Sequence, residues 1–329
     1  MRSLADTLTG FLQPISAPAP VAASAPATDG PAPATPTPDF AGVHAGLEAL
    51  VTHRRRYALD ESPVLNLFTK AIPTLGPDIV EPSIKIDGEQ VFAERVNLYF
   101  HDRARLPTLV GPLFELYERV GAMVGRDFDY GAFDLLVEHG LRLGACRDLI
   151  LGVDIRPDPA RSRLKLYVLL DEPYTDLVEH LWQLGRQRAP NPARADALSW
   201  LVPAWTRLIG VDFGFDGTST LKVYVGAPAF DYQRLRDSLD LNDAAATLMR
   251  QSPFCIVSAL DPRTPLHLLL SGDIVLELVP HRVAETIERR RQYILSVPPG
   301  EFTSERLSNM NLYYGDLRLP GGDDHVPWQ

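Results

Sequence analysis

Several residue types and segments that mark common protein classes are scarce in this sequence. Only two cysteines, Cys146 and Cys255, occur among 329 residues, and each lies within an apolar run. We therefore expect neither a disulfide framework nor a thiolate metal site, and we expect a reducing, cytoplasmic location. No segment approaches the roughly 18 apolar residues of a membrane-spanning helix, and the first thirteen residues lack the features of a signal peptide, so no membrane partner is expected.

Concentrated positive charge and several catalytic motifs are also missing. The formal net charge is -10, and the dense basic runs at 54–56 and 289–291 are short. Nucleic-acid binding needs a concentrated basic surface, so no nucleic-acid partner is expected. The sequence has no GxGxxG that opens a helix, no GxxxxGK[ST], no HExxH and no GxSxG, which argues against nucleotide cradles, zinc proteases and hydrolase elbows.

The composition that is present favours one folded domain with unstructured ends. Hydrophobic residues make up 45% of the chain, which is ample for a core. Residues 1–40 are rich in Pro and Ala and are predicted to be a disordered tail, residues 41–318 a single domain, and residues 319–329 a flexible tail. At the start of the chain, Leu4, Leu8 and Leu12 have helical spacing, which fits either a segment that docks on a partner or a frayed terminus.

The central region repeats a hairpin pattern five times. Turn signals such as Asp87-Gly88 and Asp216-Gly217 join pairs of strand-like runs, and amphipathic helices lie between the pairs. The pairs are PSIKID with FAERVNLYF, RDLILGVDI with RLKLYVLL, RLIGVDFGF with STLKVYVG, FCIVSAL with LHLLLS, and QYILSV with RLSNMNLYY. The pattern predicts an α+β fold with ten antiparallel strands and surrounding helices.

The two faces of these strands indicate how the sheet is covered. Ile84 and Ile86 alternate with Ser83 and Lys85, and other strands show the same division into an apolar and a polar face. Helices must cover the apolar face, and a ten-stranded sheet tends to curl, split or close. We therefore predict a closed barrel ringed by helices, with a polar interior wide enough for a ligand. An open sheet with one wet face is the alternative.

Two similar strands, LKLYV and LKVYV, place a lysine and a tyrosine on the polar face. Lys165 and Tyr167 share that face in one hairpin, and Lys222 and Tyr224 share it in another. Arg95 points the same way from a third hairpin, with Lys85 as a possible fourth cation. Confined cations repel one another, so an anion should lie among them, and a diphosphate can accept from several such donors at once.

The aromatic rings on the same face suggest what the anion carries. Tyr99, Tyr167, Tyr224 and Tyr313 supply ring faces that attract a desolvated cation by up to about 2 kcal/mol. Cations for a diphosphate and rings for a carbocation together predict the ionisation of an allylic diphosphate. Glu81, also on the polar face, is a candidate base. The competing interpretations are that strand lysines face solvent, that tyrosines pack in the core, and that Glu81 pairs with a neighbouring cation.

Residues 63–314 resemble the cyanobactin-type peptide prenyltransferases, which have the αββα (ABBA) prenyltransferase barrel. The resemblance lies in EPSIKID followed by AER, in GVDIRPDPARSRLKLYV, in LIGVDFGFDGTSTLKVYV and in RLSNMNLYY. It implies ten strands in a helix-ringed barrel and a dimethylallyl or geranyl diphosphate donor. It also implies Mg²⁺ held mainly by that diphosphate, and an acceptor side chain on a ribosomally made, cyclic peptide. We expect a transferase that is a monomer or a weak dimer.

The resemblance also assigns roles to residues. Glu81 looks like the base on the acceptor side, Arg95 and Lys165 look like diphosphate ligands, and Tyr224 and Tyr313 look like members of a tyrosine shield. Lys222 departs from relatives that are acidic at that position, so its assignment to the diphosphate, like that of Tyr167 to the shield, rests on the shared strand face. In the fourth hairpin, Ile256 and Val257 stand where users of five-carbon donors place bulky aromatic residues. We predict Val257 as the donor-length gate, with a ten-carbon donor accepted.

The acceptor remains open among several chemistries. Tyrosine, serine or threonine oxygen, tryptophan, histidine and arginine side chains are all possible nucleophiles, and the acids Asp154 and Asp212, which could face the lumen, do not discriminate among them. Two other functions also fit the polar lumen. One is a prenyltransferase of free aromatic small molecules, and the other is a non-catalytic barrel that binds an anionic ligand.

Overall fold

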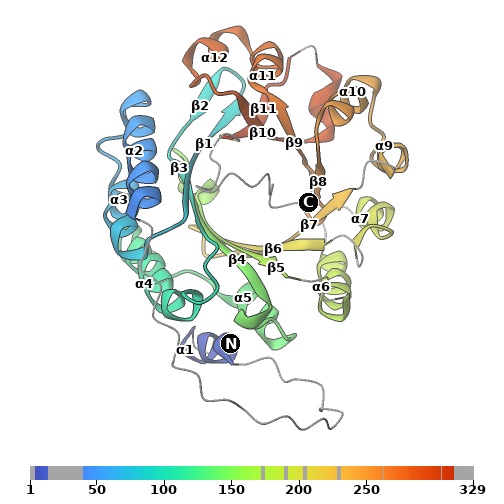
Figure 1. The fold of residues 1–329 in the computed structure, drawn as a ribbon. Helices are drawn as coiled ribbons and strands as arrows, with labels where there is room; N and C mark the ends of the chain where they lie inside the picture. Colours follow the sequence, from blue (N-terminus) through green and yellow to red (C-terminus); the bar gives the residue numbers. More distant parts are fainter. Residues whose placement is uncertain are drawn as a thin grey trace, which may run out of the picture.

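The strands close into a barrel, as the hairpin pattern predicts (Figure 1). The computed structural model describes residues 4–13, 40–171, 175–188, 192–202, 206–227, 231–261, 263–304 and 306–314. The strands are β1 (Ile79–Asp87), β2 (Gln90–Phe92), β3 (Arg95–Phe100), β4 (Cys146–Asp154), β5 (Arg163–Leu170), β6 (Thr206–Gly214), β7 (Ser219–Ala227), β8 (Cys255–Ser258), β9 (Leu266–Ser271), β10 (Gln292–Val297) and β11 (Asn309–Tyr314). Each pairs antiparallel with its neighbour, and β1 pairs with both β3 and β11, which closes the ring.

The short strand β2 was not expected and lies outside the ten-stranded ring. It pairs with the end of β1, where Lys85 lies opposite Phe92 and Asp87 opposite Gln90. The turn between them contains Gly88 at φ +63°, and the β6–β7 turn contains Gly217 at φ +82°. Glycine occupies this left-handed region without the steric cost that a Cβ adds, so both Asp-Gly pairs form the tight turns that the sequence predicts.

Helices surround the barrel on its outside, where they cover the apolar strand faces (Figure 1). The helices are α1 (Leu4–Leu12), α2 (Phe40–Arg56), α3 (Pro63–Leu75), α4 (Leu106–Val124), α5 (Gly131–Glu138), α6 (Thr175–Arg188), α7 (Pro192–Leu198), α9 (Tyr232–Leu239), α10 (Asp243–Gln251), α11 (Gly272–Leu278) and α12 (His281–Thr286). Local sequence sets their ends: in α3, the Ser62 side chain accepts from the Leu65 N–H and Gly76, at φ +58°, stops the helix.

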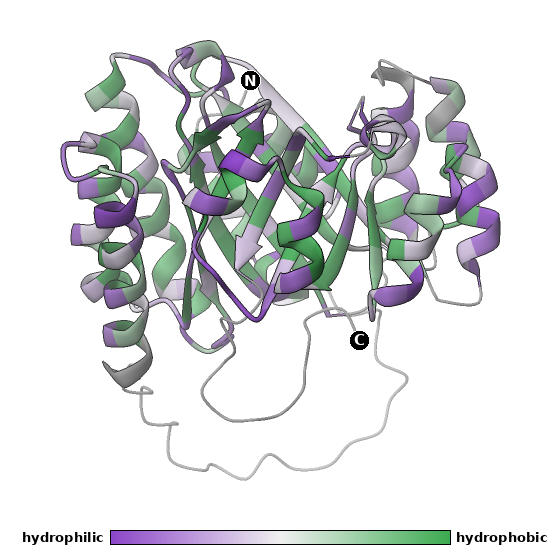
Figure 2. Ribbon diagram, turned by 90° about the horizontal axis from the view of Figure 1, so that it is seen from above, coloured by the Kyte–Doolittle hydropathy of each residue, from purple (hydrophilic) through white to green (hydrophobic). Residues whose placement is uncertain are grey.

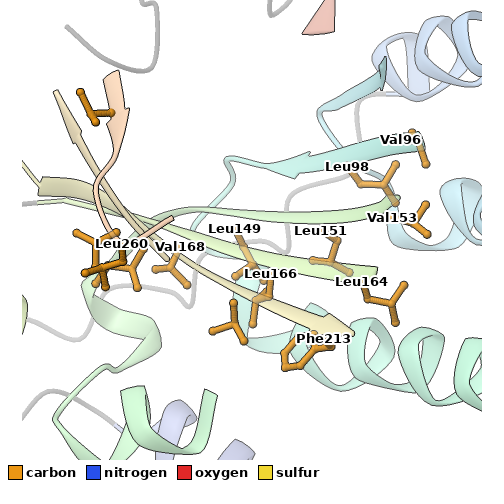
Figure 3. Close-up of a cluster of buried hydrophobic side chains, with 14 of the residues drawn as sticks. Val96, Leu98, Leu149, Leu151, Val153, Leu164, Leu166, Val168, Phe213 and Leu260 are labelled. Atoms are coloured by element: carbon orange, nitrogen blue, oxygen red, sulfur yellow. The ribbon is translucent and has the colours of Figure 1, made fainter. Parts of the chain in front are cut away.

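The main hydrophobic core lies between the barrel and the helices. Figure 3 shows part of it, where Leu149, Leu151, Leu164, Leu166 and Phe213 extend from one face of neighbouring strands. These side chains are at most 2% exposed. Figure 2 shows the consequence in hydropathy: the strands are largely hydrophobic, whereas the surrounding helices carry hydrophilic stretches as well. The apolar face of each strand thus packs against the helices, and the side chains on the opposite face point into the barrel interior.

Helix α1 corrects the prediction that all of residues 1–40 are disordered. Phe11 is 1% exposed and its ring meets that of Phe133 in α5 edge to face, with centroids 5.3 Å apart. Thr7 donates a buried hydrogen bond to Asp134. Leu4 and Leu8 also pack against the core, whereas Leu12 is 44% exposed, so the segment is a helix that packs on the chain's own α5 through part of the predicted stripe. The remaining residues of the predicted 1–40 tail and the predicted 319–329 tail lie outside the described residues.

One further expectation concerns membranes. In the part of the chain that the structure describes, no helix combines the length and the apolar character needed to cross a bilayer.

Candidate active site

Basic side chains gather at the end of the lumen where the hairpin turns lie. The sequence contains four lysines, and three of them line this cavity together with five arginines. The eight are Lys85, Arg95, Arg156, Arg161, Arg163, Lys165, Lys222 and Arg263. The prediction that Arg95, Lys165 and Lys222 meet inside one enclosed space is therefore confirmed, and Lys85 joins them.

Arg95 is held rigidly in the wall of this cavity. It is 1% exposed, and its Nη1 donates to Asn311 Oδ1 at 2.6 Å while Nη2 lies 3.4 Å from the Tyr313 hydroxyl. Its Nε is 3.6 Å from Asp154 Oδ1 and has no hydrogen-bond partner within the described part of the chain. A buried guanidinium with a free donor favours a further acceptor in the lumen.

A single carboxylate is shared by Arg95 and two other cations. Asp154 Oδ1 lies 2.7 Å from Arg156 Nε, and Asp154 Oδ2 lies 3.6 Å from Lys165 Nζ. Although burial favours the neutral acid, Arg95, Lys165 and Arg156 hold the pKa of Asp154 well below its usual range. Burial, with Arg95 nearby, lowers the pKa of Lys165 from 10.5 to about 7. Lys165 is thus a buried amine whose charge one shared carboxylate only partly compensates.

Lys222 has a different environment from Lys165. Its Nζ lies 2.6 Å from Asp212 Oδ2, which Arg163 Nη1 also contacts at 3.1 Å. Burial opposes the charge on Lys222, but Asp212 outweighs it and raises the pKa of Lys222 above its ordinary value. Lys222 is therefore a fully charged and partly neutralised member of the cluster.

The predicted tyrosines lie beside these cations. Tyr167, Tyr224 and Tyr313 all line the cavity, and the rings of Tyr167 and Tyr224 meet edge to face with centroids 5.7 Å apart. Gly210 in β6 lies opposite Tyr167, and a Cβ at this position would clash with the tyrosine ring. The Arg95 guanidinium lies over the Tyr313 ring, 5.6 Å from its centroid. The rings thus form a cation-attracting layer in contact with the basic cluster.

A second hydrophobic cluster lines the lumen and includes two of these tyrosines. It is separate from the outer core and consists of Ile150, Tyr167, Leu169, Leu208, Tyr224, Phe254, Ile256 and Leu269, with Tyr99 and Ile294 at its edge. Ile256 belongs to it, whereas Val257 belongs to the outer core and is 0% exposed. Adjacent strand residues point to opposite faces, so the prediction of Val257 as a donor-length gate is wrong, and Ile256 is the residue of that pair inside the lumen.

Glu81 lies in the lumen wall, and no basic side chain of the described residues forms an ion pair with it. It is 5% exposed, and its Oε2 accepts from Asn97 Nδ2 at 2.9 Å and from the Tyr99 hydroxyl at 2.6 Å. The ion pair with Lys85 or Arg95 that we considered does not form among the described residues, where Lys85 instead donates to Asn309. Burial raises the pKa of Glu81 to about 7, against its hydrogen bonds and the attraction of Arg95. A carboxyl of this kind can exchange a proton near neutral pH.

Comparison with known proteins places the chain in a sequence family. Residues 45–279 match a family described as of unknown function, DUF5838. The chain belongs to the DUF5838 family. No curated protein sequence matches it.

Several solved structures are similar to this DUF5838 chain at low sequence identity. The NotF prenyltransferase is 15% identical over 86% of this chain and 96% of its own, with a TM-score of 0.54. The 5-dimethylallyltryptophan synthase from Streptomyces coelicolor is 14% identical over 82% and 97%, with a TM-score of 0.49, and PriB with product diphosphate is 11% identical over 82% and 95%, with a TM-score of 0.48. The likeness to NotF shows that the chain has the αββα prenyltransferase barrel fold.

Several cavity residues were not singled out from the sequence, although some carry the same signal. Arg163 precedes Lys165 by two residues and Arg156 follows Asp154 by two, so the period of a strand places both on the lumen side. Arg263 lies in the loop between β8 and β9, where no periodicity indicates its direction. His267 also lines the cavity, and its Nε2 lies 2.9 Å from the Ser258 hydroxyl.

The residues among these cations are a poor fit for the Mg²⁺ that the family resemblance implies. Proteins commonly bind Mg²⁺ through one or two carboxylates together with substrate phosphates. Asp154 and Asp212, the buried carboxylates here, already contact three and two basic side chains respectively. Over the described ranges, no cluster of three or more His, Cys, Asp or Glu side chains could hold a metal ion.

Proposed function

We propose that this chain transfers an allylic prenyl group from an isoprenoid diphosphate to a side chain of a peptide. The observation that carries the proposal is the contact between two layers inside one lumen, the basic cluster and the tyrosines, because this pair of environments suits the two fragments of an ionising allylic diphosphate. The barrel fold shared with the NotF prenyltransferase supports it. The peptide acceptor rests on the resemblance to the cyanobactin-type enzymes.

In the proposed reaction, Arg95, Lys165 and Lys222 bind the diphosphate of the donor. The bond between the allylic carbon and the bridging oxygen breaks, and its electron pair leaves with the diphosphate, whose growing charge these cations stabilise. The allylic cation forms against Tyr167 and Tyr224, and the rings keep water away from it. The acceptor nucleophile then bonds to the allylic carbon and loses its proton to the ionised Glu81.

The apolar cluster is the proposed binding site for the hydrocarbon tail. Leu208 lies opposite Tyr224, and Ile256 and Leu269 belong to the same hydrophobic cluster, so a tail that starts at the allylic carbon would extend among them. These side chains are aliphatic, which leaves more room than aromatic residues would. We propose that the donor is dimethylallyl or geranyl diphosphate, with the longer tail accepted because Ile256 is of moderate size.

The test is a product analysis with separate donors and acceptors. Purified protein is incubated with dimethylallyl or geranyl diphosphate, and either a panel of linear and cyclic peptides or free tyrosine and tryptophan. Mass spectrometry reports the product, and a coupled assay reports released pyrophosphate. We expect a gain of one prenyl mass on a peptide, absent with Lys165→Met protein. If only the free amino acids give prenylated products, the small-molecule alternative is favoured. If none of the reactions releases pyrophosphate, a non-catalytic binding barrel is favoured.

A further inference from the structure

The basic cluster has more positive charge than its own carboxylates can neutralise. Among the residues that the structure describes, eight basic side chains line the cavity, and four carboxylates contact them. The four are Asp87, Asp154, Asp212 and Asp261. When all of these groups are ionised, four positive charges remain. Such a surplus in a partly enclosed space is unfavourable unless an anion is bound there.

The two most buried of these four carboxylates each contact several cations. Asp212 is 3% exposed and lies between Lys222 and Arg163, while Asp154 is 5% exposed and lies among three cations. Asp212 Oδ1 has no hydrogen-bond partner among the described residues, but a metal ion bound at either carboxylate would lie close to two or three buried cations and would be repelled by them. Glu81 is also a weak candidate, because burial raises its pKa to about 7 and it is partly protonated at neutral pH.

We propose that this barrel binds its donor as the metal-free diphosphate, with the protein's own cations in the place of Mg²⁺. The inference rests on the proposed function, since it concerns the donor of that reaction. A prenyl diphosphate carries about three negative charges at neutral pH. The surplus in the cavity lies between two and four, because burial lowers the pKa of Lys85 and of Lys165 to about 7 and each can lose its proton when no anion is bound there. The Mg²⁺ complex of the diphosphate carries about one negative charge, so it would be attracted less strongly, and the metal ion itself would be repelled by the arginines.

The individual donors in the cavity match this role. Lys165 Nζ has no acceptor within hydrogen-bonding distance in the described structure, since Asp154 Oδ2 is 3.6 Å away, and Arg95 Nε is likewise without a partner. Both atoms belong to side chains that are at least 95% buried and line the cavity. Phosphate oxygens would satisfy both donors directly. A fully charged Lys165 would then be favoured, because the bound anion supplies the compensation that Asp154 alone does not.

The test measures binding of inorganic pyrophosphate to the full chain by isothermal titration calorimetry, which does not depend on turnover. One titration contains EDTA and the other contains Mg²⁺ in excess of pyrophosphate. We expect binding in EDTA, and binding at least about tenfold weaker in Mg²⁺, because the metal ion cancels part of the anion's charge and occupies phosphate oxygens that the basic side chains would otherwise contact. Binding that requires Mg²⁺ would overturn the inference. No binding in either buffer would overturn both the inference and the diphosphate site.

Variants make the assignment specific to these cations. Lys165→Gln and Arg263→Gln each remove one positive charge from the cavity, and Arg263 is about half exposed in a loop, so its replacement should not disturb folding. We expect each to weaken binding in EDTA by at least about tenfold and to reduce the penalty caused by Mg²⁺. The control, Arg282→Gln, removes an arginine from the exposed surface of α12 and should change neither. Equal effects of all three variants would contradict the proposal.

Turnover distinguishes a failure of this inference from a failure of the proposed function. Prenyl transfer that occurs in Mg²⁺ and stops in EDTA would keep the proposed function and refute the metal-free donor. Prenyl transfer that continues in EDTA would support both. Binding of pyrophosphate in EDTA without prenyl transfer to any acceptor would support the anion site and count against the peptide acceptor.

Discussion

Replacing Lys165 with methionine should make the barrel more stable and catalytically inactive. Lys165 is 5% exposed and lies 3.6 Å from its one carboxylate contact, Asp154, which Arg95 and Arg156 also use. Methionine has a similar length and no charge to desolvate. Asp154 keeps its two arginine partners in the variant, so the substitution does not leave a buried carboxylate alone.

The stability gain follows from the pKa of the lysine. Burial and the nearby Arg95 lower the pKa of Lys165 from 10.5 to about 7. At about 1.4 kcal/mol per pH unit, this difference sets an upper limit of about 5 kcal/mol on the cost of the charged form at neutral pH. Because relaxation and water reduce such costs, we expect Lys165→Met to raise the free energy of unfolding by about 1–3 kcal/mol at pH 7.

The pH dependence of the free energy of unfolding provides a second test of whether Lys165 destabilises the fold. Between pH 7 and 10.5 the unfolded chain keeps a proton on Lys165 that the folded chain has lost. The free energy of unfolding should therefore increase as the pH rises through this range, and the destabilisation should be fully present below pH 7. This contribution to the slope should be missing in Lys165→Met, so the gain from the substitution should shrink as the pH approaches 10.5.

Urea denaturation at several pH values measures the stability, and pyrophosphate release measures the activity. Removing a group that stabilises the leaving charge commonly costs about 10²–10³ in turnover. Lys70→Met, at an exposed position of α3, is the control and should change neither quantity. A variant that is less stable than the wild type, or that keeps full turnover, would refute the description of Lys165 as a desolvated ligand.

Three further predictions concern other parts of the chain. Turnover should rise with pH through about 7 as Glu81 ionises, which a pH profile under saturating donor would measure. Glu81→Gln should remove this rise and lower the rate by about 10²–10⁴. Ile256→Ala should shift preference toward the geranyl donor by roughly tenfold in competition assays, whereas Val257→Ala should cost stability and leave the ratio unchanged. Phe11→Ala should release α1 from Phe133, seen as faster proteolysis before Phe40 with the barrel's turnover unaffected.

The strands could be predicted from the sequence because their signal is local. Alternation with period two in LKLYV and LKVYV fixes which side chains share a face, and Asp-Gly pairs fix where the chain turns. Once the faces were assigned, the lumen position of Lys165 and Lys222 required only that the ring close. The pairing of β1 with β11 supplies that closure, and it joins segments more than 200 residues apart.

Two kinds of feature could not be predicted from the sequence. One is which of two adjacent apolar strand residues faces the lumen, and the other is contact between side chains that are distant in the sequence. Ile256 and Val257 are both apolar, so composition does not say which one faces the lumen, and a shift of one residue exchanges them. The docking of Phe11 on Phe133 joins two distant helices. The hydrogen bonds that Glu81 accepts from Asn97 and Tyr99, and the sharing of Asp154 among several cations, likewise depend on which side chains meet across several strands.

The order of residues along one strand also fixes the direction in which a donor would lie. Arg163, Lys165, Tyr167 and Leu169 all face the lumen from β5, and alternate strand residues are spaced about 6–7 Å apart. The strand therefore passes from two cations to a ring and then to an aliphatic side chain. Lys222 and Tyr224 repeat the sequence of cation and ring in β7, which runs in the same direction because both strands are antiparallel to β6. Diphosphate, allylic carbon and hydrocarbon tail follow in the same order along a prenyl donor. A donor bound in the opposite direction would place its charge among Leu169, Leu208 and Ile256, which belong to the hydrophobic cluster, and would lose the basic side chains that line the other end.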